Sequence, residues 1–172
     1  MTTRTLTNCT FNISDFDKVK QKVLNWAQRF NTFCFLDNHQ YSTEPHTVEC
    51  LLAAGVKRQL KAEPGNALEQ LQRFIADVPL SVRDSLPRQG GGQTRGWLFG
   101  HLSYDLKNEI EELSSSHIDL IDFPDLFFFE PEVLIRLNKN EMKIEADDAG
   151  KIYDEIYNEN PLPAAPTQKR IC

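Results

Sequence analysis

The sequence has few cysteines and no closely spaced cysteine pair. Its four cysteines stand at positions 9, 34, 50 and 172, and none forms a C-x-x-C motif. Cys34 and Cys50 lie in apolar runs, where a free cysteine behaves as a small core residue. The first sixteen residues contain no apolar segment of the kind that secretory signal peptides require. These absences predict a reduced, cytoplasmic compartment.

The sequence also lacks an excess of positive charge and a long apolar run. The 172 residues have a formal net charge of −6, whereas phosphate binding and attachment to an anionic membrane surface both need basic residues. No run approaches the roughly 18–20 apolar residues of a membrane-spanning helix. We therefore expect neither nucleic acid nor a membrane among the partners. The length suits one domain with a substantial core.

Three stretches have the apolar spacing of amphipathic helices. Residues 14–30 place Phe16, Val19, Val23, Trp26, Ala27 and Phe30 on one face. Ser14 is the expected N-cap of this helix. Residues 66–78 and 147–158 show the same periodicity. A short fourth helix is expected over 105–113, with Asp105 as its N-cap.

Extended patterns alternate with these helices. We expect a strand at 32–37, one bent strand or two strands meeting near Gly55 within 47–62, and a strand at 96–105. The apolar run 122–137 and residues 142–146 flank a turn at 138–141 and predict an antiparallel hairpin. Three consecutive phenylalanines, 127–129, cannot all face one side of a strand. At least one should face outward, toward a second helix layer or a partner surface.

The element order favours an α+β fold, with helices on one face of an antiparallel or mixed sheet. Residues 79–96 form a long Gly- and Pro-rich loop, and residues 159–172 read as a Pro-rich linker. One domain over residues 1–158 is the expected organisation.

The row Ser103, Tyr104 and Asp105 follows the glycine-rich loop and resembles an active site in composition. The loop "GGGQTRG" matches neither a P-loop nor a dinucleotide fingerprint. Ser103 lacks the flanking glycines of a nucleophile elbow. Tyr104 has an asparagine, not a lysine, four residues later. Structural roles are therefore favoured, with Asp105 capping a helix and Tyr104 and Phe99 packing.

Metal binding is poorly supported as well. His101, Asp105 and Glu109 have helical spacing, but His101 lies in a strand-like run. A second group, His39, Glu44, His46 and Glu49, lacks zinc-site spacing and fits a solvated loop. The acidic residues of 105–113, including Glu109, fit a solvated helix face. We expect no catalytic, cofactor-binding or metal-binding residue in this chain.

The run "GWLFGHLSYDLKNEIEEL", followed by "IDFPDLFFFEPEVLIRL", resembles the N-terminal region of chorismate-utilising enzymes. These are aminodeoxychorismate synthase component I (para-aminobenzoate synthase component I) and anthranilate synthase component I. The resemblance covers about residues 30–145 and leans toward the aminodeoxychorismate enzyme, whose N-terminal region is similarly short. His101 stands where the family usually has an aromatic residue. The matching positions are Phe99, Gly100, Leu102, Ser103, Tyr104, Asp105, Leu106, Pro124 and Asp125.

The resemblance implies that this chain is the N-terminal part of a layered α/β/β/α fold. The family's chorismate-binding, magnesium-binding and catalytic residues belong to a C-terminal domain, toward which residues 159–172 would lead. The full enzyme would use magnesium and ammonia from a glutamine amidotransferase subunit. Leu36 and Asn38 match positions of a tryptophan pocket, although the family typically has serine at the position of Asn38. A structural loop at 37–46 is an equal alternative.

Two functions remain open on these grounds. The first is a non-catalytic N-terminal domain of an aminodeoxychorismate synthase-like enzyme or of the anthranilate branch. The second is a stand-alone module that binds a small ligand or a partner on the same scaffold.

Overall fold

The computed structural model describes residues 7–39, 50–62, 65–77, 97–111 and 124–158. The helical segments are α1 (Phe16–Ala27), α2 (Ala67–Ala76), the 3-10 turn η1 (Tyr104–Leu106), α4 (Lys107–Glu111) and α5 (Ala149–Asn158). The first four strands are β1 (Thr7–Asn12), β2 (Phe33–Asp37), β3 (Cys50–Ala54) and β4 (Arg58–Ala62). The others are β5 (Phe99–Leu102), β6 (Leu126–Glu130), β7 (Val133–Leu137) and β8 (Glu141–Ala146). No helix in the described ranges is long and apolar enough to cross a membrane.

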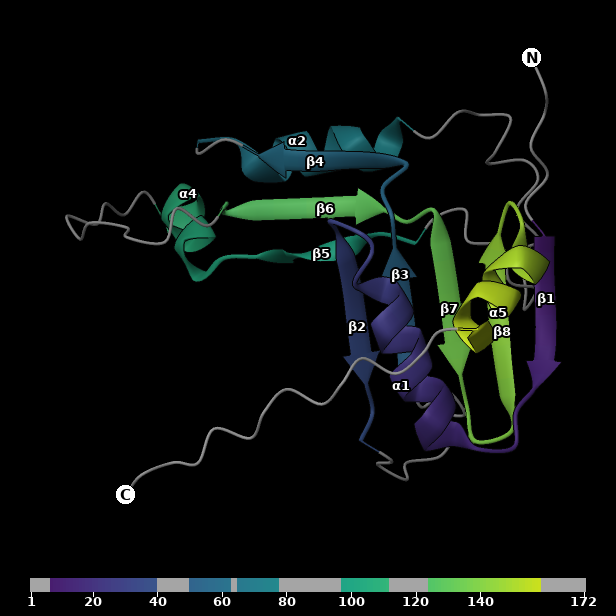
Figure 1. Ribbon diagram of the computed structural model, residues 1–172. Helices are drawn as coiled ribbons and strands as arrows, with labels where there is room; N and C mark the ends of the chain where they lie inside the picture. Colours follow the sequence, from purple (N-terminus) through teal and green to yellow (C-terminus); the bar gives the residue numbers. More distant parts are fainter. Residues whose placement is uncertain (1–6, 40–49, 63–64, 78–96, 112–123, 159–172) are drawn as a thin grey trace, which may run out of the picture.

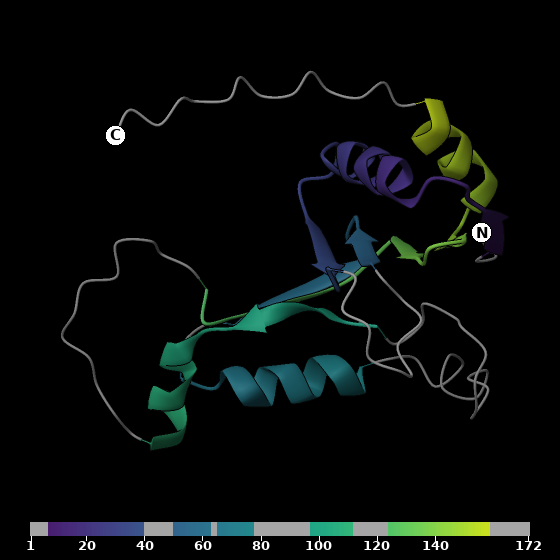
Figure 2. The same cartoon turned by 90° about the horizontal axis from the view of Figure 1, so that it is seen from below.

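The strands form two sheets that run across each other in Figure 1. One has the order β1-β8-β7-β3-β2 and the other the order β4-β6-β5, and the strand pairs in both are antiparallel. Helices α1 and α5 lie on one side of the strands and α2 lies on the other (Figure 2). The predicted α+β class with antiparallel pairing is confirmed.

A bent ribbon of two chain segments joins the sheets. β3 continues into β4 through Gly55, and β6 continues into β7 through Pro131 and Glu132. Gly55 has φ +72°, a conformation that favours glycine, and its N–H donates to the Thr32 carbonyl over 3.1 Å. A side chain at Gly55 would meet Glu132. The predicted pair of strands meeting near Gly55 is thus confirmed.

The larger core lies between the five-stranded sheet and the helices α1 and α5. The apolar face expected for α1 packs here, and Trp26 also donates its indole N–H to Glu155 Oε2 over 3.0 Å. Each fully buried side chain contributes about 1.5–3 kcal/mol. The largest fully buried apolar members are Trp26, Leu52, Ile135, Leu137, Met142, Ile144 and Ile156.

A smaller core lies between α2 and the three-stranded sheet. Phe128 packs here beside Leu71 of α2 and Leu106 of η1. Phe127 and Phe129 belong to the opposite face of β6 and pack with Phe99. The consecutive phenylalanines are therefore accommodated by a helix layer on one face and an aromatic cluster on the other.

The ends of α1 differ from the prediction. The helix begins at Phe16, so Asp15 and not Ser14 is the N-cap. The Asp15 backbone is extended, and its carboxylate accepts a hydrogen bond from the Lys18 N–H over 3.1 Å. A carboxylate at this position also interacts favourably with the positive end of the helix dipole.

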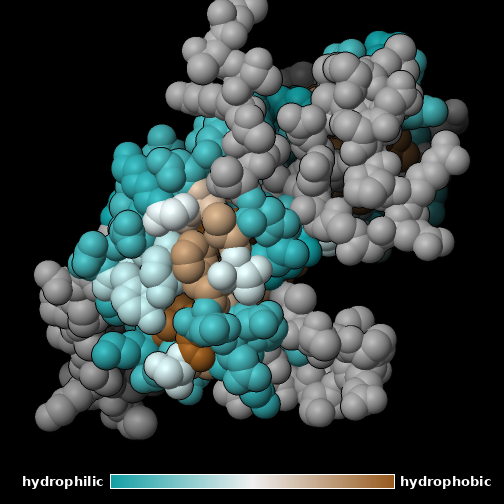
Figure 3. Space-filling model, turned by 90° about the vertical axis from the view of Figure 1, so that its right-hand side faces the viewer, coloured by the Kyte–Doolittle hydropathy of each residue, from teal (hydrophilic) through white to brown (hydrophobic). Residues whose placement is uncertain are grey.

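Strand β1 was not expected from the sequence. It pairs along its whole length with β8, from Thr7 opposite Ala146 to Asn12 opposite Glu141. Only Cys9 and Phe11 are apolar, and Phe11 stacks on Tyr153 of α5 with a centroid distance of 3.9 Å. On the side of the molecule where β1 is the sheet edge, a small hydrophobic area is surrounded by hydrophilic residues (Figure 3).

Three predictions lie outside the described residues. They are the loop at 79–96, the linker at 159–172, and the histidine and glutamates at positions 44–49.

Candidate functional site

The sequence run that resembles the chorismate-utilising enzymes folds into one junction. Strand β5 ends at Leu102, and η1 and α4 follow directly. Ser103 donates its hydroxyl to Asp125 Oδ1 over 2.7 Å and its backbone N–H to the Asp125 carbonyl over 2.7 Å. His101 Nε2 lies 3.1 Å from the Pro124 carbonyl oxygen. The two separate parts of the motif thus meet in space.

Gly100 and Phe99 have structural roles in this junction. A Cβ atom at Gly100 would lie 1.9 Å from the Phe127 carbonyl oxygen, so the strands β5 and β6 approach closely there. Phe99 is 5% exposed and packs with Phe129, Ala53 and Leu134. The expected packing of Phe99 is confirmed.

The roles expected for Tyr104 and Asp105 are wrong. Tyr104 is 80% exposed, and its ring lies 4.0 Å from the Lys107 ammonium instead of packing in the core. Asp105 lies inside the 3-10 turn, and Ser103 occupies the cap position with extended backbone. The cap position therefore lies two residues earlier than expected, at Ser103 instead of Asp105. The Ser103 hydroxyl is directed to Asp125, consistent with a structural role.

Glu109 also departs from the expected solvated face. Its carboxylate accepts hydrogen bonds from the backbone N–H groups of Gly65, over 2.6 Å, and Ala67, over 2.9 Å. The Ala67 N–H belongs to the first turn of α2 and has no acceptor within the helix, and the Asn66 side chain makes no capping bond there. Glu109 therefore caps a helix distant in sequence, a contact that local patterning does not reveal.

The two positions that the resemblance matches to a tryptophan pocket, Leu36 and Asn38, lie at the end of β2. Leu36 is 53% exposed on the sheet face away from α1, and Asn38 follows the strand. Asp37, between them, forms an ion pair with Lys20 of α1 and accepts a hydrogen bond from the His39 N–H over 2.9 Å. Cys50 Sγ lies 3.6 Å from Asp37 Oδ1. The residue at the centre of this segment is thus Asp37, which serves as an anchor between strand and helix.

The ion pair between Lys20 and Asp37 perturbs both groups. The hydrogen bond from Lys20 is the largest cause that lowers the pKa of Asp37, with burial acting in the opposite direction. The same hydrogen bond raises the pKa of Lys20. Both pKa shifts favour the charged forms. The resulting ion pair holds the end of β2 against α1.

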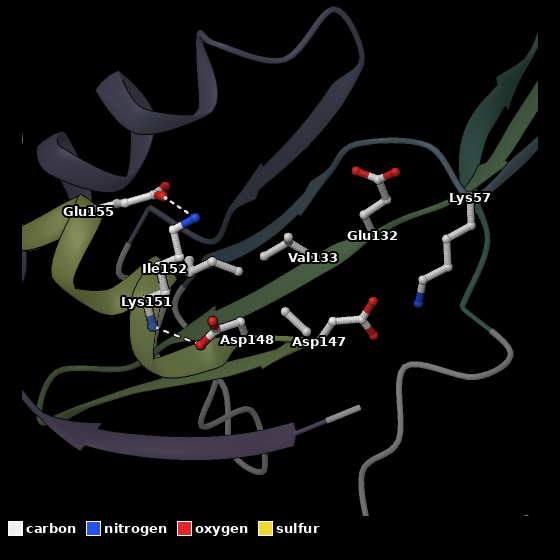
Figure 4. Close-up of a pocket in the computed structure, with 9 residues that line it drawn as sticks. Lys57, Glu132, Val133, Asp147, Asp148, Lys151, Ile152 and Glu155 are labelled. Carbon is white, nitrogen blue, oxygen red and sulfur yellow. Dashed lines mark hydrogen bonds and ion pairs between the residues drawn. The ribbon is translucent and has the colours of Figure 1, made fainter. Parts of the chain in front are cut away.

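A cleft of about 580 Å³ lies beside the first turn of α5. Its apolar lining residues are Val133, Ala146 and Ile152 (Figure 4). Its charged lining residues are Lys57 and Glu132 from the connections between the two sheets, Asp147 and Asp148 before α5, and Lys151 and Glu155 of α5. Lys57 extends toward Asp147 in this view, whereas Glu132 points away from it.

Several of the charged groups in the cleft have structural partners. The Asp148 carboxylate accepts from the Lys151 N–H over 3.2 Å. Glu155 accepts from Trp26 and Arg29 and lies 3.9 Å from the Lys151 ammonium. In the described ranges, no group of three or more His, Cys, Asp or Glu residues is arranged to hold a metal ion. The carboxylates of Asp148 and Glu155 are therefore already engaged in structural contacts.

The face of the five-stranded sheet away from α1 and α5 carries a second cluster. Cys34, Leu51, Ala53 and Leu134 pack there with Phe99, Phe127 and Phe129. Trp97, which precedes β5, is 43% exposed and stacks on Phe99 with a centroid distance of 6.1 Å. This face therefore combines buried apolar residues with exposed aromatic surface.

Comparison with known protein families finds no match, and comparison with curated proteins also finds none. Among solved structures, the chain is similar to MenF, the menaquinone-specific isochorismate synthase from Escherichia coli. The sequence identity is 12% and the TM-score is 0.42. The similarity covers 95% of this chain and 31% of that chain, so this chain spans about a third of its length.

Proposed function

We propose that this chain acts as the N-terminal, non-catalytic domain of an aminodeoxychorismate synthase component I-like enzyme. Such an enzyme converts chorismate and ammonia to 4-amino-4-deoxychorismate for the folate and para-aminobenzoate pathway. The observation that supports this best is the junction between Ser103 and Asp125. Two sequence segments that resemble the same family meet there through two hydrogen bonds of 2.7 Å.

The geometry also accounts for the residue types of the motif. Gly100 permits the close approach of β5 and β6, Phe99 fills the core, and Ser103 ties the strand end to Asp125. These are scaffold functions. They agree with a domain whose motif supports catalysis performed by residues elsewhere in a longer enzyme.

The proposal assigns chorismate binding, magnesium and catalysis to a C-terminal domain, and ammonia supply to a glutamine amidotransferase subunit. The sheet face that carries Leu36, Trp97 and Phe127 is the surface we assign to the C-terminal domain. Exposed apolar surface next to an otherwise packed sheet is typical of such an interface.

An activity assay with separated domains tests this function. Purified chain 1–172 is incubated with chorismate, ammonia and magnesium, alone and with the separately expressed C-terminal domain of an aminodeoxychorismate synthase component I. Chromatography measures aminodeoxychorismate and anthranilate. We expect no product from 1–172 alone and aminodeoxychorismate from the mixture at a rate above that of the C-terminal domain alone. Turnover by 1–172 alone would overturn the non-catalytic role, and anthranilate as product would move the chain to that branch.

The alternative, a stand-alone binding module, is favoured by the exposed Trp97 and Leu36. Thermal melting separates the two functions. A domain of the enzyme should melt at a higher temperature when the C-terminal domain is added. An independent module should be monodisperse and melt at an unchanged temperature.

A further inference from the structure

The strand register places two cations side by side on the sheet face away from α1 and α5. Arg136 of β7 is opposite Lys143 of β8 and, on its other side, opposite Leu51 of β3. Directly opposite residues share a face with Cβ atoms about 5 Å apart, and like charges in such positions destabilise the sheet. A negative group near this pair therefore stabilises the sheet.

Glu145 supplies only part of that negative charge. It lies two residues from Lys143 on the same face, is 2% exposed, and its Oε1 is 2.9 Å from Arg136 Nη2. Neither Glu145 oxygen has a well-oriented hydrogen-bond partner. Arg136, Lys143 and Glu145 together carry one net positive charge, and Glu141, the other carboxylate on this face of β8, is exposed. A buried pair of this kind adds little to stability, so its main effect is to fix the guanidinium in place.

The aromatic ring of Trp97 lies beside the cluster of Arg136, Lys143 and Glu145. The Arg136 guanidinium carbon lies 5.5 Å from the centroid of the Trp97 ring, within the range of a cation–π interaction. Arg136 keeps about a fifth of its side chain exposed, and Trp97 is exposed as well. In the described part of the chain, the contacts of Arg136 are Glu145 and Trp97. Among the described residues, the guanidinium therefore has N–H groups left for a ligand.

We propose that Arg136, Lys143 and Trp97 form a binding site for a small aromatic carboxylate. The ligand carboxylate lies between the guanidinium of Arg136 and the ammonium of Lys143 and balances the excess positive charge. The planar guanidinium suits bidentate recognition of a carboxylate. The apolar body of the ligand lies over Leu51 and against Trp97. The site shares Trp97 with the surface assigned above to the C-terminal domain, but it uses no residue of the junction between Ser103 and Asp125 that supports the proposed function.

Benzoate and its uncharged analogue benzamide are suitable probes for the site. The chain has two tryptophans, so a proton–nitrogen correlation spectrum contains two indole signals. Trp26, which is buried in the other core, serves as the internal reference. At constant ionic strength, we expect benzoate to shift the Trp97 signal in a saturable way and to bind at least tenfold more tightly than benzamide. The Trp26 signal should not move.

Variants identify the residues responsible. Arg136→Gln should weaken benzoate binding at least tenfold, and Lys143→Gln should weaken it several-fold. Arg58→Gln is the matched control, because Arg58 also pairs with a partly buried glutamate, Glu130, and stacks on an aromatic ring, Phe74. This control should bind benzoate like the wild type. Lys143→Gln keeps the test valid if Arg136→Gln fails to fold, because the side chain of Lys143 is not buried.

Three results would overturn the proposal. The first is the absence of a saturable Trp97 shift with benzoate, and the second is an equal affinity for benzoate and benzamide. The third is unchanged benzoate binding in folded Arg136→Gln or Lys143→Gln protein. None of these readouts involves chorismate, so the proposed function stands or falls separately.

Discussion

Replacing Gly100 with alanine should destabilise the protein markedly, although the residue lies on a short edge strand. The added Cβ would lie 1.9 Å from the Phe127 carbonyl oxygen and 2.7 Å from Phe128 Cα. Both are backbone atoms and cannot rotate away. Since real Cβ contacts are essentially never under 3.0 Å, β5 must move by about 1 Å relative to β6. Overpacking of this kind typically costs about 1–3 kcal/mol.

The movement also affects the neighbouring core residue. Phe99 is buried against Phe129, with ring centroids 6.1 Å apart, and full burial of such a side chain contributes about 1.5–3 kcal/mol. Partial loss of this burial leads us to expect a total decrease of about 2–3 kcal/mol in the free energy of unfolding. Urea denaturation followed by circular dichroism and tryptophan fluorescence measures it.

Gly150→Ala is the matched control for this substitution. Apart from its chain neighbours and the backbone of its own helix, no atom lies within 4 Å of a Cβ at Gly150, which is in α5. Alanine is the better helix former by about 1 kcal/mol, so this variant should be as stable as the wild type or more stable. If Gly100→Ala stays within about 0.5 kcal/mol of the wild type, β5 and β6 do not approach as closely as described. The structural explanation of this motif glycine would then be refuted.

Three further predictions concern the contacts that hold the helices. Asp37→Asn should lower the free energy of unfolding at neutral pH by about 1 kcal/mol. Because the pKa of Asp37 is lowered from 3.8 and that of Lys20 is raised from 10.5, the difference from the wild type should shrink below pH 3.8 and above pH 10.5. A difference that stays constant in urea titrations across pH would contradict the ion pair. Glu109→Ala should lower the free energy of unfolding by about 1 kcal/mol and speed amide hydrogen exchange at Ala67. The substitution Glu111→Ala at an exposed neighbour should change neither quantity. Equal exchange rates at Ala67 in the two variants would exclude the cap. Trp26→Phe should cost about 1–3 kcal/mol, because it removes the indole hydrogen bond to Glu155 and leaves a gap in the core. Trp97→Phe at the exposed site should cost under about 0.5 kcal/mol. Similar unfolding midpoints for the two variants would contradict the assignment of Trp26 to the core.

Local patterns were sufficient for much of this fold. The helical spacing of Val19, Val23 and Trp26 identified α1 and its buried face, and Gly55 marked the point where β3 gives way to β4. Contacts between distant segments were not accessible in this way. Strand β1 is recognisable only through its partner β8, far along the chain, and the capping of α2 by Glu109 has no sequence signal at either end.

The candidate site, like the fold, could be predicted only where local sequence patterns are enough. The motif around Ser103 was found from the sequence, but its hydrogen bond to Asp125 required the fold. Arg136 and Lys143 were overlooked, although a signal was present. The predicted turn at 138–141 already implies a hairpin register that places these two residues opposite each other. A check of charges across that hairpin would have identified the pair.

The bent ribbon has a consequence for how the chain could be divided. Ala54 and Val133 are register partners at the ends of β3 and β7, so residues 55–132 leave the five-stranded sheet and return to it at adjacent positions. The three-stranded sheet and α2 therefore form an insertion within a smaller unit made of β1, α1, β2, β3, β7, β8 and α5. A two-residue turn such as Asn-Gly has the geometry to join two antiparallel strands at such a point. The smaller unit, closed by such a turn, would keep all the buried residues of the larger core.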